Sequence, residues 1–158
     1  MTQVRKRIYF AAPLFTSWER RANYELTKRL EEEHSVYLPQ RDGLLLADEL
    51  AAGSNRQAVA TEVYLGDCAA IKSADVLVAV LSGPSIDDGV AFEIGYAAAL
   101  RIPCVGLMDD SRRAGDYFQN PMWRGALDAE CANSDELVEA IRLVSLRTGG
   151  RSNGFTHP

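Results

Sequence analysis

Residues 75–81 read Asp-Val-Leu-Val-Ala-Val-Leu (DVLVAVL), an almost unbroken run of apolar side chains. Such a run is typical of a strand whose sheet is covered on both faces, because a half-exposed strand alternates apolar and polar residues. The patterns of residues 56–73 before it and residues 87–100 after it predict helices. A buried strand between two helices favours a doubly wound α/β fold with a parallel sheet.

The same alternation extends in both directions along the chain. Further strands are expected at Arg7–Ala12, Val36–Leu38 and Pro103–Met108, and further helices at Ser17–Glu33 and Ser134–Leu146, the last with Ser134 as N-cap. Residues 41–55, with some helical turns, and residues 109–128 are expected to be loops. With 158 residues, we expect one domain over residues 1–146 and a C-terminal tail over residues 147–158.

Composition excludes several classes of function. The net charge is −5, with 47% hydrophobic and 25% charged residues, so we expect neither nucleic acid nor an anionic membrane as partner. No apolar run approaches the roughly 20 residues of a membrane span, and the apolar stretch at residues 8–15 fits a buried strand better than a signal peptide. The glycine-rich phosphate loops of dinucleotide and P-loop enzymes are absent.

Cysteine and histidine are scarce. Cys68, Cys104 and Cys131 are odd in number and form no CxxC pair, which favours a reducing cytoplasm over a disulfide framework or zinc site. His34 is expected at the end of a helix, where a partial positive charge suits the dipole, and His157 is the penultimate residue. We therefore expect acid–base chemistry to rest on carboxylates, with no metal and no cofactor.

Three carboxylates are the candidates for that chemistry. Glu93 is the only charged residue within 89–100, a stretch rich in glycine and alanine, and a carboxylate buried there is costly without a task or a partner. The alternative is a solvated or salt-bridged glutamate. Asp87 and Asp88 can each act as N-cap of the same helix, and one can cap while the other faces a ligand. Asp67 lies within the preceding helix, where a surface charge is the alternative.

Aromatic residues near the first strand have two interpretations. Tyr9 alternates with Ile8 and Phe10, so it either packs in the core or faces a ligand. Trp18 and Trp123 can stack on a base or pack against the protein, and packing is favoured.

Several segments together resemble the nucleoside 2-deoxyribosyltransferases. They appear in the order of that family and cover about residues 7–125: IYFAAPLF (8–15), YLPQRD (37–42), DCAAIKSADVLVAVL (67–81), DDGVAFEIGYAAAL (87–100) and NPM (120–122). The resemblance implies a flavodoxin-like α/β fold, a doubly wound parallel sheet of about five strands with helices on both faces. It implies deoxynucleosides and free nucleobases as ligands.

The resemblance also implies a role for individual residues. Glu93 matches the nucleophile of the family, Tyr9 the tyrosine that orients it, and Asp67 and Asp87 the acidic pair that handles the nucleobase and its proton. The substrate-binding positions that match are Phe15, Gln40, Asp42, Gly89, Asn120 and Met122. Asn120 and Met122 match a segment that reaches the sugar 5′-hydroxyl from a neighbouring subunit.

The expected reaction is transfer of a 2-deoxyribosyl group between bases by double displacement. One carboxylate traps the sugar covalently while an acid protonates the departing base, as in retaining glycoside chemistry. Two alternatives stay open. One is hydrolysis of 2-deoxynucleosides or nucleoside 5′-monophosphates, with Ser82, Ser85, Arg112 and Arg113 as candidate phosphate ligands. The other is a non-catalytic nucleotide sensor of the same fold.

Residues 109–128 contain a group of large or rigid apolar residues that one small domain covers with difficulty: Tyr117, Phe118, Pro121, Met122 and Trp123. Such groups usually mark interfaces, so we expect a homo-oligomer, a dimer or a hexamer, with shared active sites. The alternative is that this loop folds back over its own sheet.

Overall fold

The computed structural model describes residues 4–83, 85–110 and 120–144. The expected tail at 147–158, Arg112, Arg113, Tyr117 and Phe118 lie outside these residues. The strands are β1 (Arg7–Ala11), β2 (Ser35–Tyr37), β3 (Val76–Val80), β4 (Cys104–Leu107) and β5 (Ala129–Cys131). The helices are α1 (Ser17–Glu31), α2 (Pro39–Asp42), α3 (Leu46–Ala51), α4 (Arg56–Ser73), α5 (Asp88–Ala99), α6 (Pro121–Arg124) and α7 (Ser134–Val144).

The five strands form one parallel sheet in the order β2-β1-β3-β4-β5. This confirms the expected doubly wound α/β fold. The strand order reverses between β1 and β3, the point at which such sheets bind ligands beyond their carboxyl ends. The sequence did not locate β5, because three residues with a central glutamate carry no strand pattern and only pairing with β4 orders them.

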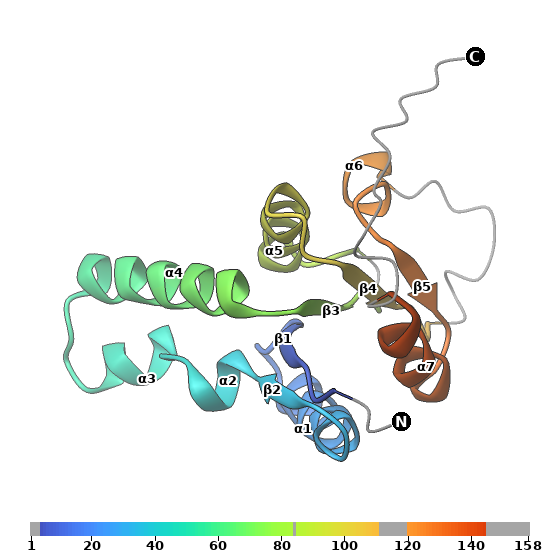
Figure 1. Cartoon of the computed structure of the whole chain (residues 1–158). Helices are drawn as coiled ribbons and strands as arrows, with labels where there is room; N and C mark the ends of the chain where they lie inside the picture. The colour runs from blue at the N-terminus through green and yellow to red at the C-terminus, as the bar shows by residue number, and fades with distance from the viewer. Residues whose placement is uncertain (1–3, 84, 111–119, 145–158) are drawn as a thin grey trace.

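Helices cover both faces of the sheet (Figure 1). The face under α1 and α7 buries one set of side chains, including Ile8 and Phe10 of β1. The face under α4 and α5 buries the other, including Tyr9 and Ala11. Because neighbouring side chains on a strand point to opposite faces, β1 directs Tyr9 toward the two helices that hold Asp67 and Glu93.

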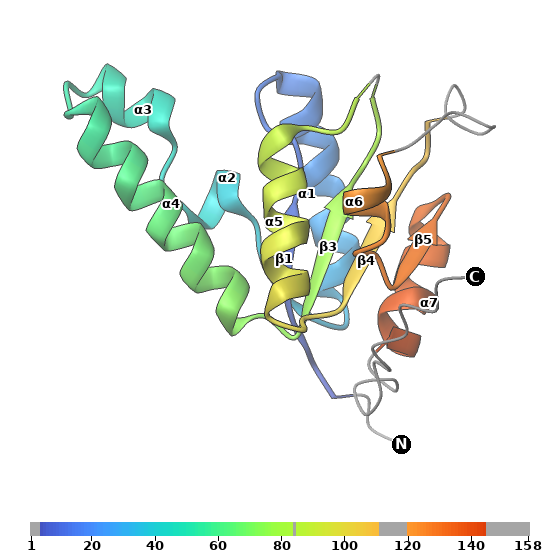
Figure 2. The same cartoon turned by 90° about the horizontal axis from the view of Figure 1, so that it is seen from above.

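Helices α4 and α5 are close at one end and apart at the other. Figure 2 shows them together near the amino-terminal ends of the strands, at the bottom of the picture, and separated near the carboxyl ends. Asp67 of α4 and Glu93 of α5 meet at the side chain of Tyr9, with which both hydrogen-bond. None of the helices in the described part of the chain is long and apolar enough to cross a membrane.

Two local expectations from the sequence are wrong. Asn133, not Ser134, caps α7, because its Oδ1 accepts from the backbone N–H groups of Asp135 and Glu136 at 3.1 and 2.9 Å. His34 is only 1% exposed, and neither ring nitrogen has a hydrogen-bond partner among the described residues. Burial and then the nearby Lys6 lower the pKa of His34, so the ring is neutral rather than positively charged.

Candidate active site

The carboxylate of Glu93 lies against the hydroxyl of Tyr9. Glu93 is in the second turn of α5, and Tyr9 is fully buried in β1 directly beneath it. The phenol donates a hydrogen bond of 2.5 Å to Oε1 of Glu93. Burial, and then the charges of Asp67 and Asp87, raise the pKa of Glu93 to about 8, although the Tyr9 hydrogen bond opposes this rise. Glu93 is therefore a desolvated carboxylate that accepts a hydrogen bond from one tyrosine.

Asp67 reaches the same place from α4. Burial raises its pKa, while hydrogen bonds with the hydroxyls of Tyr9 and Tyr37 work in the opposite direction. The rings of Tyr9 and Tyr37 are stacked, with centroids 5.6 Å apart and planes 16° from parallel. Two carboxyl groups and two phenols from four different elements thus share one desolvated environment.

Asp87 is the N-cap of α5. Its Oδ1 accepts from the backbone N–H of Val90 at 3.1 Å, and Asp88 next to it is exposed. A Cβ at Gly89 would lie 3.0 Å from that oxygen, so glycine leaves the capping carboxylate its place. The capping interpretation of Asp87 is therefore confirmed. The same carboxylate is close enough to Glu93 to raise its pKa.

Phe15 follows β1 in the turn before α1 and is 71% exposed. It lines a cavity of 620 Å³ together with Leu14, Leu45 and Leu50, on the side of the turn that faces α3. Arg20 donates hydrogen bonds to the carbonyl oxygens of Leu14 and Phe15, which fixes the turn.

Gln40 and Asp42 have structural contacts. The amide of Gln40 donates to the carbonyl of Arg20 at 2.8 Å and accepts from Asn23 at 3.0 Å, joining α2 to α1. Asp42 accepts from the backbone N–H of Leu38 and pairs with Arg41, each at 2.8 Å. The polar groups of both side chains are therefore already engaged in contacts within the fold.

Asn120 and Met122 lie at the start of α6. Asn120 caps the helix by accepting from the backbone N–H of Met122 at 2.9 Å, and Met122 is 81% exposed. Trp123, in contrast, is buried in the core under α5, which decides for packing over base stacking. Trp18 is exposed and lines a different cavity.

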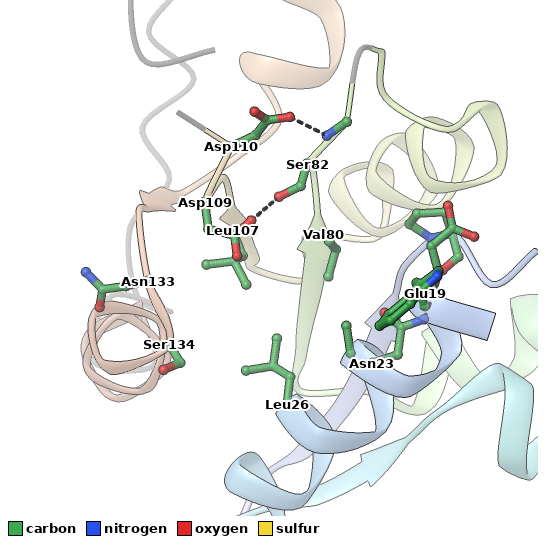
Figure 3. A pocket seen from close by; sticks show the side chains of 14 residues that line it. Glu19, Asn23, Leu26, Val80, Ser82, Leu107, Asp109, Asp110, Asn133 and Ser134 are labelled. Atoms are coloured by element: carbon green, nitrogen blue, oxygen red, sulfur yellow. Dashed lines mark hydrogen bonds between the residues drawn. The ribbon is translucent and has the colours of Figure 1, made fainter. Parts of the chain in front are cut away.

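That cavity lies under the other face of the sheet, between α1 and the first residues of α7 (Figure 3). It has a volume of 810 Å³, and its upper edge holds a hydrogen bond from the hydroxyl of Ser82 to Asp109. Tyr9, Asp67, Asp87 and Glu93 do not line it. The candidate active site is therefore the cluster of Tyr9, Asp67 and Glu93 on the opposite face of the sheet, where β1, α4 and α5 meet.

Sequence reasoning missed Tyr37. It stands in register with Tyr9 across the β1–β2 pair, but only strand pairing reveals that two tyrosines 28 positions apart are neighbours. In residues 4–83, 85–110 and 120–144, no three His, Cys, Asp or Glu side chains form a group that could hold a metal ion.

A model of the nucleoside 2-deoxyribosyltransferase family matches residues 8–139. The chain belongs to this family. The match spans every strand and includes Tyr9, Asp67, Asp87 and Glu93. Among curated protein sequences, none matches this chain.

Solved structures are similar to this chain in fold. A conserved protein from Enterococcus faecalis shares 29% identity with a TM-score of 0.74, covering 88% of this chain and 98% of that one. A 2-deoxyribosyltransferase from Bacillus psychrosaccharolyticus shares 24% identity with a TM-score of 0.65, over 84% and 90% of the two chains. A CMP N-glycosidase from Clostridium botulinum shares 19% identity with a TM-score of 0.52, over 87% and 100%. The last two similarities concern the fold alone.

Proposed function

We propose that this member of the nucleoside 2-deoxyribosyltransferase family transfers a 2-deoxyribosyl group from one nucleobase to another. The observation that carries the proposal is the hydrogen bond from Tyr9 to a buried Glu93 whose pKa is raised to about 8. A non-catalytic sensor has no use for such a carboxylate, because its desolvation works against folding. A nucleophile needs a basic, poorly solvated oxygen.

In the first half-reaction a carboxylate oxygen of Glu93 attacks C1′ of the sugar. The bond between C1′ and the base nitrogen breaks, its electron pair stays on the base, and the base takes a proton from Asp67. In the second half-reaction a nitrogen of another base attacks C1′, the ester bond to Glu93 breaks, and Asp67 recovers a proton from the incoming base. Two displacements at C1′ give net retention.

These steps require that the two carboxyl groups hold one proton between them. That proton must lie on Asp67 rather than on Glu93. Both carboxyl groups have raised pKa values, mainly through burial. Closely coupled groups lose their protons in steps that belong to the pair. The singly protonated pair, with its proton on Asp67, is the form that can react.

Charge favours nucleosides over nucleoside 5′-monophosphates. A helix N-terminus is a ready site for a phosphate, but at α5 the Asp87 carboxylate already accepts the Val90 N–H. The hydroxyl of Ser82, a candidate phosphate ligand, is bound to the carboxylate of Asp109. We therefore propose a nucleoside with a free 5′-hydroxyl as substrate.

The exposure of Met122 and the position of Asn120 support a site completed by a second copy of the chain. We propose that these two residues close the 5′-hydroxyl end of the pocket of a neighbouring subunit in a homo-oligomer.

The test is to incubate the protein with thymidine and free adenine and to separate the products. Deoxyadenosine supports the transferase, whereas free deoxyribose without deoxyadenosine supports the hydrolase. Glu93→Gln is the matched control, since it keeps the shape of the side chain and removes the nucleophile. Its rate should fall by at least about three orders of magnitude. Intact mass spectrometry should show an added deoxyribosyl group on the native protein only.

A further inference from the structure

Tyr37 occupies the position beside Tyr9 on the neighbouring strand. The two residues are in register across the parallel β1–β2 pair, so both side chains leave the sheet on the α4–α5 side. Their rings stack with centroids 5.6 Å apart. The stack fixes the direction of both phenols, because neither ring can turn without displacing the other.

The hydroxyl of Tyr37 is given its space by Gly43. A Cβ at Gly43 would lie 2.9 Å from that hydroxyl and 2.9 Å from the carbonyl oxygen of Pro39. The backbone φ of Gly43 is −101°, so no left-handed conformation requires glycine there. Glycine is required because a Cβ would meet both the phenol and that carbonyl oxygen, so the end of α2 lies directly against the Tyr37 hydroxyl.

The two phenols differ in the hydrogen bonds that they can donate to the two carboxylates. A phenol has one proton, and Tyr9 donates its proton to Glu93. While Tyr9 does so, it has no second proton to donate to Asp67. The hydroxyl of Tyr37 hydrogen-bonds with Asp67 and retains a proton to donate. Tyr37 is therefore the phenol that orients the Asp67 carboxyl when that group is ionised.

We propose that Tyr37 is a positioning residue for Asp67, as Tyr9 is for Glu93. The inference rests on the proposed function, in which Asp67 gives a proton to the departing base and takes one from the incoming base. When Asp67 has lost its proton, the Tyr37 hydroxyl donates to one carboxylate oxygen. The other oxygen then stays directed toward the base.

The test is Tyr37→Phe, which keeps the stacked ring and removes only the hydroxyl. We expect kcat to fall about 10-fold, the loss expected for one hydrogen bond to a charged group, with KM nearly unchanged. The alkaline limb of the rate profile should move to higher pH, because the lost hydrogen bond lowered the pKa of Asp67. The fall should be larger for deoxyuridine than for 5-fluorodeoxyuridine, whose more acidic base leaves with less help.

Two further variants separate positioning from general damage. Tyr24→Phe on α1 removes a phenol hydroxyl from a ring that lies under Lys28, and it should change neither kcat nor the pH profile. In an Asp67→Asn background, Tyr37→Phe should have little further effect, since the group it positions is gone. An equal loss in both backgrounds, or an unmoved pH profile in the single variant, would overturn the inference. If the unaltered protein transforms no nucleoside, the proposed function itself has failed.

Discussion

Tyr9 and Glu93 are 84 positions apart in the chain, yet the phenol of one donates a 2.5 Å hydrogen bond to the carboxylate of the other. The contact joins the first strand of the sheet to the helix after the third strand. Because β1 lies beside β3 in the sheet, the helix that follows β3 packs close to β1, and the two residues meet although they are far apart in the sequence. The contact also ties the reactivity of Glu93 to the core of the sheet, since Tyr9 is fully buried.

Removing the Tyr9 hydroxyl should raise the pKa of Glu93 above about 8, since the Tyr9 hydrogen bond is the interaction that lowers it. We expect Tyr9→Phe to lower kcat by about 10- to 100-fold, because without this hydrogen bond the Glu93 carboxylate is less often oriented for attack on the sugar. The ¹³C chemical shift of the labelled Glu93 carboxyl, followed from pH 5 to 10, measures the change in pKa directly. A midpoint that stays in place would contradict the assigned role of this hydrogen bond.

Replacing the nucleophile should stabilise the protein at high pH. The pKa of Glu93 is raised from 4.5 to about 8, so between these values the folded chain holds a proton that the unfolded chain has released. The unfolding free energy therefore falls as pH rises through this range. Glu93→Gln removes the effect and should gain about 1–2 kcal/mol at pH 9, after allowance for partial solvent screening.

Urea unfolding at pH 5 and pH 9 measures this gain, with Glu62→Gln on the exposed side of α4 as control. The stabilisation by Glu93→Gln should be much smaller at pH 5 than at pH 9. A gain of equal size at both pH values would show that packing, not ionisation, is its source.

The charge of Asp87 should govern discrimination against phosphate. Asp87→Asn preserves an N-cap of equal rank and removes the negative charge, so the helix should keep its stability. We expect the ratio of kcat/KM for a deoxynucleoside 5′-monophosphate to kcat/KM for the deoxynucleoside to rise about 10-fold, which is about 1.4 kcal/mol.

The ratio, rather than either rate alone, is the readout, because Asp87 also raises the pKa of Glu93. Asp87→Ala is the companion variant: it removes the same charge and also the cap, and should cost about 1 kcal/mol of stability. If the ratio stays constant in both variants, the N-terminus of α5 plays no part in the choice between nucleoside and nucleoside 5′-monophosphate.

His34 should make the protein sensitive to mild acid. Its pKa is lowered by burial and then by Lys6, with Arg142 and Arg5 acting in the same direction and Glu33 against it. The neutral ring is compatible with the fold above the ordinary histidine pKa of about 6.5, and stability is lost as pH falls below that value. Thermal unfolding of the native protein should show this loss between pH 7 and pH 5, and His34→Leu should reduce it.

A shared active site can be tested by subunit exchange. Glu93→Gln and Asn120→Ala proteins should each be inactive or severely impaired, and mixing them under exchange conditions should restore part of the activity. In a mixed assembly some sites combine an intact Glu93 from one subunit with an intact Asn120 from the other. A protein that is monomeric by light scattering and active at nanomolar concentration would rule out the shared site.

The sequence alone predicted the elements that have strong periodicity. Helix 56–73 was placed to the residue, and the buried run at 75–81 contains β3. Glu93 was identifiable because it is the only charged residue within 89–100, and a charge in such an apolar stretch conflicts with burial. The sequence could not place β5, or choose between Ser134 and Asn133 as a cap, since neighbouring polar residues have nearly equal propensities.

Only the tertiary structure decided which residues meet. Tyr37 became part of the site through its register with Tyr9, and Trp123 became core through the packing of α6 against α5. His34 lost its charge because the chain after α1 buries the side chain of His34 although α1 itself ends near the surface. The periodic pattern of apolar residues predicts which face of a helix or strand is buried, because that face is determined by residues close together in the chain. Contacts between distant segments depend on how strands pair and helices cross, and no local pattern encodes them.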